Sequence, residues 1–87
     1  MITVTKQVNI RELLEKNNGD IKAVHDKYRR AAEEFIKNEG GTDSPTGLKI
    51  ESATQSSVFL HYTYNRQPSV KLFDKHNEVF DKYLNSL

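Results

Sequence analysis

A helical repeat of apolar side chains between residues 21 and 36 is the feature that most limits how this chain can fold. Its members are Ile21, Val24, Tyr28, Ala31, Ala32, Phe35 and Ile36. Spacings of three and four residues place these side chains on one face of an α-helix. Asp20 stands before the repeat as an N-cap, and Gly40 follows it where a helix commonly ends. The repeat therefore predicts a helix from about residue 21 to residue 39, packed on a core through one face.

Two segments farther along the chain alternate with a period of two. Residues 48–51 and 58–64 each place an apolar side chain at every second position, which is typical of a strand buried on one side. After a turn, Val70-Lys71-Leu72 is expected as a third strand of an antiparallel meander, and a helix that starts at Asp74 ends the chain. If that helix starts at Ser69 instead, the third strand disappears.

The first residues of the chain predict one more strand and one more helix. Residues 2–8 alternate around Lys6, and a lysine is a common guard on the edge strand of a sheet. A short helix over residues 10–17 follows and is stopped by Asn17-Asn18-Gly19. Residues 40–47, which are rich in turn formers, separate the helical first half from the strand-rich second half.

The predicted element order is β-α-α-β-β-β-α, which is an α+β fold. We expect the helices to pack on one face of a three- to four-stranded, mainly antiparallel sheet. The 87 residues are enough for one domain that spans residues 1–87.

The exposed face of this sheet is the candidate binding surface. If the apolar strand positions face the helices, the opposite face carries Lys49, Glu51, Phe59, His61, Thr63 and Lys71, and Arg66 lies in the adjoining turn. The candidate contact residues among these are Lys49, Phe59, His61, Arg66 and Lys71.

Three interpretations of this face remain open. Phe59 and His61 could stack on unpaired bases while nearby cations hold phosphates, as in sheet-based RNA binders. Phe59 could equally anchor a protein interface. A single exposed phenylalanine is also ordinary, because folded surfaces are largely apolar.

No motif for catalysis, metal binding or cofactor binding is present in the sequence. There is no cysteine, and the three histidines share no metal-ligand spacing. We therefore expect no enzyme, and no catalytic, cofactor or metal residues. A metal-free ribonuclease that uses His61, Tyr62, Arg66 and Lys71 is a weaker alternative. Neighbouring residues of a strand point to opposite faces, so His61 and Tyr62 should not share a site.

Charge and size bear on the partner. The 13 basic and 12 acidic residues leave a net charge of +1, whereas a dedicated nucleic-acid binder usually has a clear basic excess. We expect a small regulator or inhibitor with an unidentified protein partner, and RNA or single-stranded nucleic acid is the alternative. Small accessory proteins of bacteria and phages are often of this kind. No apolar run approaches membrane-spanning length, and we expect a cytoplasmic protein. The small core and an exposed edge strand predict a homodimer.

Overall fold

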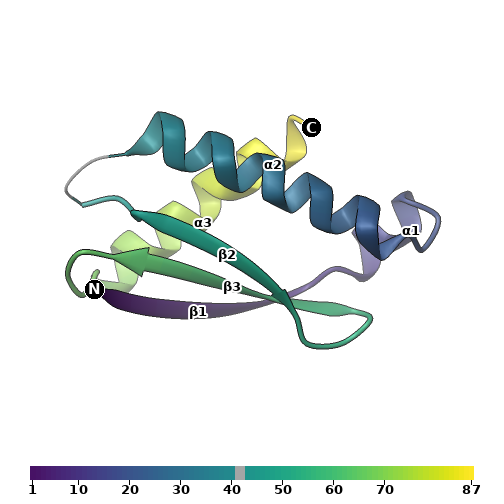
Figure 1. Ribbon diagram of the computed structural model, residues 1–87, viewed down its shortest axis with the longest axis horizontal. Helices are drawn as coiled ribbons and strands as arrows, with labels where there is room; N and C mark the ends of the chain where they lie inside the picture. The colour runs from purple at the N-terminus through teal and green to yellow at the C-terminus, as the bar shows by residue number, and fades with distance from the viewer. Residues whose placement is uncertain (41–42) are drawn as a thin grey trace.

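The computed structural model describes residues 1–40 and 43–87, and within these ranges it contains three strands and three helices (Figure 1). The elements are β1 (Ile2–Asn9), α1 (Arg11–Lys16), α2 (Ile21–Glu39), β2 (Gly47–Ser52), β3 (Ser57–Tyr64) and α3 (Val70–Asn85). The three strands form one antiparallel sheet, and α2 and α3 lie on one face of it. The predicted α+β class is therefore confirmed.

The sheet has the order β1-β3-β2, so the last strand in sequence lies at its centre. In this register His61 of β3 lies opposite Thr5 on one side and Lys49 on the other. The period-two pattern of β3 separates the two faces. Its buried residues Val58, Leu60, Tyr62 and Tyr64 face the helices, and the residues between them point to the opposite side of the sheet.

Aromatic rings form the centre of the core between the helices and the sheet. The ring of Phe80 in α3 lies 5.8 Å from that of Tyr28, 6.1 Å from that of Phe35 and 6.4 Å from that of Tyr62, measured between centroids. Tyr28 and Phe35 come from α2 and Tyr62 comes from β3. One residue of α3 thus joins the helical layer to the central strand.

The long helix has the bounds that its repeat predicts. The side chain of Asp20 accepts hydrogen bonds from the backbone N–H groups of Lys22 and Ala23, at 3.1 and 3.3 Å. In the turn before it, Asn18 and Gly19 have φ angles of 57° and 75°. Glycine enters this left-handed region without steric cost, which explains how the chain reverses between α1 and α2.

The C-terminal helix starts earlier than Asp74. Residues 70–72, expected as a third strand of the meander, form the first turn of α3. The hydroxyl of Ser69 accepts a hydrogen bond from the backbone N–H of Leu72 at 3.1 Å, so the alternative start at Ser69 is the one adopted. Three residues of apolar–polar–apolar sequence fit either structure, and the cap together with the packing of Phe73 on the core favours the helix.

Two further findings complete the fold. Gly40 follows α2 in an extended conformation, whereas residues 41 and 42 of the predicted loop over residues 40–47 lie outside the described residues. No helix within residues 1–40 and 43–87 is long and apolar enough to cross a membrane.

Candidate binding surface on the outer sheet face

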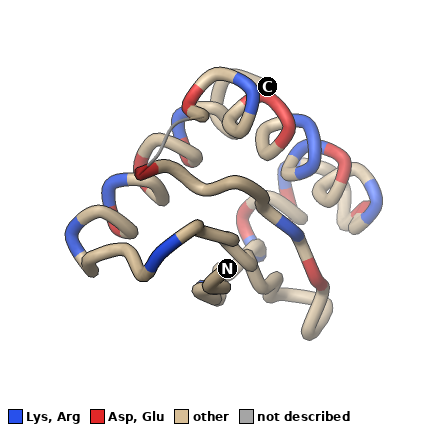
Figure 2. Tube along the Cα trace, turned by 60° about the vertical axis from the view of Figure 1, so that its left-hand side comes forward, with Lys and Arg blue, Asp and Glu red and all other residues tan. Residues whose placement is uncertain are grey.

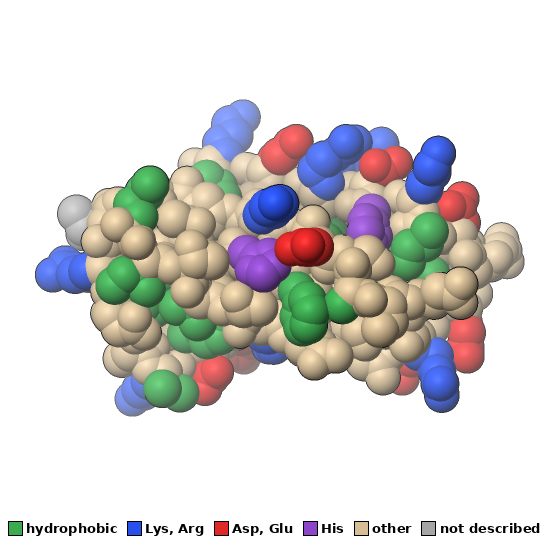
Figure 3. Space-filling model, turned by 60° about the horizontal axis from the view of Figure 1, so that its bottom comes forward, with side chains coloured by type: hydrophobic (Ala, Val, Ile, Leu, Met, Phe, Trp, Pro, Cys, Tyr) green, Lys and Arg blue, Asp and Glu red, His purple; other side chains and the backbone are tan. Residues whose placement is uncertain are grey.

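The surface of the sheet that faces away from the helices is defined by alternate residues of all three strands. We call it the outer sheet face, and its residues are Thr3, Thr5, Gln7, Gly47, Lys49, Glu51, Phe59, His61 and Thr63. Viewed from the sheet side, basic, acidic, histidine and hydrophobic side chains lie next to one another near its centre (Figure 3).

His61 lies at the centre of a hydrogen-bonded chain across the three strands. Its Nε2 lies 3.2 Å from Oε2 of Glu51, and its Nδ1 lies 3.1 Å from Oγ1 of Thr5. A carboxylate can only accept, so Nε2–H donates to Glu51. In the neutral ring, Nδ1 then accepts from the hydroxyl of Thr5. These contacts fix both the tautomer and the orientation of the imidazole.

The order hydroxyl, imidazole, carboxylate is also the order that activates a nucleophile in acyl-transfer enzymes. Here the chain lies on an open face, and the side chain of Glu51 is 60% exposed. Such a surface does not exclude water from the hydroxyl of Thr5. The chain therefore holds His61 in place, and both ring nitrogens are already engaged.

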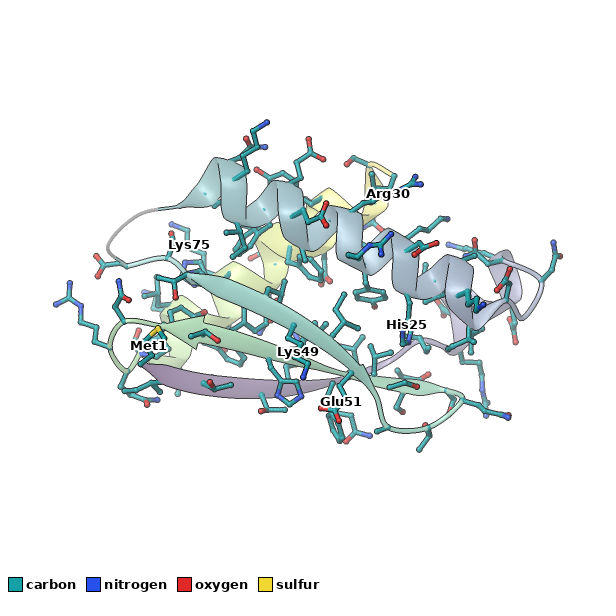
Figure 4. The ribbon with its side chains drawn as sticks, in the orientation of Figure 1. Met1, His25, Arg30, Lys49, Glu51 and Lys75 are labelled. Carbon is teal, nitrogen blue, oxygen red and sulfur yellow. The ribbon has the colours of Figure 1, made fainter. Side chains whose placement is uncertain are left out.

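Phe59 provides the apolar centre of the outer sheet face. It is half-buried, and its ring centroid lies 6.3 Å from that of His61. Lys49 and Glu51 project from β2 beside this pair, on the side of the sheet away from α2 (Figure 4). The structure thus brings Lys49, Phe59 and His61 together, as the period-two pattern predicts.

The two other candidate residues lie elsewhere. Lys71 is exposed in the first turn of α3, because residues 70–72 are helical. Arg66 lies in the turn after β3, where its guanidinium contacts Oδ1 of Asp43 at 3.0 Å. Of the cations expected beside Phe59, Lys49 alone lies on the outer sheet face as defined above. Most Lys and Arg positions lie on the helices, interleaved with Asp and Glu (Figure 2).

The hairpin cluster of a metal-free ribonuclease is not assembled. Tyr62 is fully buried on the helical side of β3, opposite to His61, and neither Arg66 nor Lys71 lies on the outer sheet face. Burial also raises the pKa of the Tyr62 hydroxyl far above its ordinary value, which keeps that hydroxyl protonated.

Groups with shifted pKa values lie on the helical side of the sheet. Burial raises the pKa of Tyr28 to about 12, and the carboxylate of Asp81 contributes. Burial also raises the pKa of Asp81, against the opposing effect of Lys6. Tyr28 and Asp81 line a cavity of about 520 Å³ between α1 and α3. In the described part of the chain, no group of three or more His, Asp or Glu residues could hold a metal ion.

The sequence singled out His61 but not its two partners in a site. Thr5 is 56 residues away and is brought to His61 only by the pairing of β1 with β3. The period of two predicts Glu51 on the outer sheet face, but its contact with His61 depends on the register between β2 and β3. No protein-family model matches this sequence, and neither a curated protein nor a solved structure matches it.

Proposed function

We propose that the chain is a small, non-enzymatic regulator or inhibitor that binds a protein partner stoichiometrically through the outer sheet face. The observation that carries the proposal is Phe59, a half-buried aromatic ring at the centre of an open sheet surface on which the charges of Lys49 and Glu51 balance. Aromatic anchors surrounded by polar contacts are typical of the energetic centre of protein interfaces.

The charge distribution supports a protein over a nucleic acid. Lys49 and Glu51 lie next to each other on β2, so the centre of the outer sheet face has no net charge when His61 is neutral. A nucleic-acid surface needs several cations that neutralise phosphates. Arg66 is engaged with Asp43 and Lys71 is on α3.

The size of the molecule is compatible with one ordinary interface. Its principal extents are 38 × 23 × 18 Å. The area of a face that contains the longest axis is therefore comparable to the ~800 Å² that each partner buries in a standard complex. The lack of cysteine fits a reducing compartment, and we place the protein in the cytoplasm.

Binding of RNA or single-stranded nucleic acid is the second candidate function. The ring pair of Phe59 and His61 beside Lys49 favours it, because aromatic side chains next to a cation can stack on unpaired bases. This candidate predicts an affinity that falls steeply with salt, whereas a protein complex should survive moderate salt.

The test compares the wild type with Phe59→Ala as bait for partners, followed by titration of each captured species. For a protein partner, we expect Phe59→Ala to weaken binding by at least about tenfold, the effect of losing an interface anchor. Val70→Ala is the matched control, because Val70 is 78% exposed on α3 and lies away from the outer sheet face.

Unfolding in urea shows whether each variant keeps the fold. Equal binding by wild type and Phe59→Ala would contradict the proposal. Nucleic acid that co-purifies, is removed by salt and is lost with Phe59→Ala would establish the second candidate instead. If Phe59→Ala unfolds the chain, its side chain is structural and both candidates fail.

A further inference from the structure

Among residues 1–40 and 43–87, no strand pairs with the outer edge of β2, and backbone hydrogen-bonding groups point toward that edge. Ala53 N–H donates to Ser57 O at 3.3 Å in the register of the β2–β3 pair. Bonded and non-bonded pairs alternate in an antiparallel ladder, so every second residue of β2 bonds β3. The residues between them direct their N–H and C=O groups toward the open edge, and these residues are Leu48, Ile50 and Ser52.

An open groove runs beside this edge, between β2 and α2. Its volume is about 710 Å³, and its apolar lining includes Ala32, Ile36, Leu48 and Ile50. The inward-facing side chains of Leu48 and Ile50 are only half-buried. A strand added to β2 would bury this apolar surface and satisfy these backbone groups of β2 in the same step.

The opposite edge of the sheet is protected against such pairing. β1 carries Lys6 at an inward-facing position in the middle of the strand. An inward-pointing charge on an edge strand opposes the addition of another strand. The inward-facing positions of β2 carry Leu48, Ile50 and Ser52 instead, none of them charged.

The charges of Lys49 and Glu51 determine which strand fits against the edge of β2 and how the two strands are aligned. Lys49 and Glu51 flank Ile50 on the outer sheet face. If a second copy pairs antiparallel about a two-fold axis at Ile50, Lys49 of each copy lies opposite Glu51 of the other. An axis at Lys49 or at Glu51 would place like charges opposite each other, which destabilises a pair of strands.

We propose that two copies of the chain associate through β2, antiparallel and centred on Ile50, into one continuous sheet. The sign of charge also alternates along the α2 rim of the groove, through Asp26, Arg29, Glu33 and Lys37. A two-fold axis reverses that order in the second copy, so opposite charges can meet. The outer sheet faces of both copies lie on the same side of the joined sheet. The pairing does not depend on the function proposed for that face.

The first test is sedimentation equilibrium over a range of concentrations. We expect a species of twice the 10.0 kDa chain mass. Lys49→Glu should raise the dissociation constant of the dimer by at least about tenfold, because two attractive pairs become repulsive. The double variant Lys49→Glu/Glu51→Lys restores opposite charges and should return the dissociation constant to near that of the wild type. Lys71→Glu, the same charge change on α3, should have no effect on it.

The second test uses the absence of cysteine to fix the register. Lys49→Cys and Glu51→Cys chains each carry one thiol. In the proposed register these two positions face each other across the dimer, within disulfide reach. Two copies of the same variant hold their thiols diagonally, about 7–8 Å apart. Mild oxidation should therefore cross-link the mixture of the two variants and leave each variant alone largely uncross-linked.

Three results would overturn the proposal. The first is a wild-type chain that is monomeric at all concentrations, and the second is a dimer whose dissociation constant does not respond to Lys49→Glu. The third is cross-linking of either variant by itself as efficient as that of the mixture. Phe59→Ala should dimerise like the wild type, which separates failure of this interface from failure of the outer-face proposal.

Discussion

At the residue scale, His61 and His76 show how burial gives one side-chain type two roles. His61 bridges strands on the outer sheet face through Thr5 and Glu51. His76 of α3 is buried, where its Nδ1 lies 2.9 Å from the hydroxyl oxygen of Tyr64. Burial raises the pKa of Tyr64 to about 12, so this hydroxyl stays protonated throughout the physiological pH range. Burial of His76 favours its neutral imidazole over the charged form.

The first prediction concerns the effect of pH on stability. Burial lowers the pKa of His76 below 6.5, Lys75 adds to this, and Glu39 opposes it. The unfolded chain then binds a proton at a higher pH than the folded chain. The contribution of His76 to the free energy of unfolding should be complete above about pH 6.5 and fall as the pH drops through the folded pKa. Urea unfolding between pH 8 and pH 5 measures this fall.

His76→Asn removes the titrating group and should flatten the pH dependence in this window. Tyr64→Phe is the matched control: it removes the hydrogen bond but leaves the burial that dominates the pKa shift, so the fall with pH should remain. The same pH dependence in His76→Asn and wild type would contradict the assignment.

At the scale of the elements, the start of α3 is decided by its cap. Ser69 is the N-cap, which makes Lys71 the second residue of the helix. A helix N-terminus carries a partial positive charge, so Lys71 is unfavourably placed there. If residues 70–72 formed a strand, Ser69 would not cap a helix and Lys71 would not lie at a helix N-terminus.

The second prediction follows from this placement of Lys71. Ser69→Ala should lower the free energy of unfolding by about 1 kcal/mol, because the N–H of Leu72 loses its partner. Lys71→Glu should raise it by about 0.3–1 kcal/mol at low salt, and the gain should shrink as salt is added. Urea unfolding at two ionic strengths measures both effects. A loss of stability in Lys71→Glu would be inconsistent with its position in the first turn.

At the scale of the whole molecule, Phe80 links α3, α2 and β3. It is fully buried, and a chain of 87 residues has a modest total stability. Its ring therefore accounts for a large share of the difference between the folded and unfolded states.

The third prediction is that Phe80→Ala lowers the free energy of unfolding by about 3–5 kcal/mol, since it removes buried apolar surface and leaves a cavity. That loss is comparable to the whole margin of many small domains. Phe80→Leu keeps more of the buried surface and should lose clearly less. The urea midpoint of each variant tests this, and a Phe80→Ala midpoint near that of the wild type would show that the core does not depend on this ring.

The sequence by itself determined the elements whose pattern is local. The repeat and caps of residues 20–40 placed α2, and the period of two placed Lys49, Phe59 and His61 on one face. These features depend on residues a few positions apart, where helical and strand geometry fix the direction of each side chain. The same local view could not separate strand from helix at residues 70–72, where three residues fit both.

Only the tertiary structure decided which distant segments meet. The central position of β3, the contact of His61 with Thr5 across 56 residues and the burial of His76 beside Tyr64 all depend on it. Such contacts are set by the packing of the whole chain, in which the free energy of burying one core selects among many possible pairings. A local pattern predicts the direction in which a side chain points, whereas only the packing of the whole chain determines which residues it contacts.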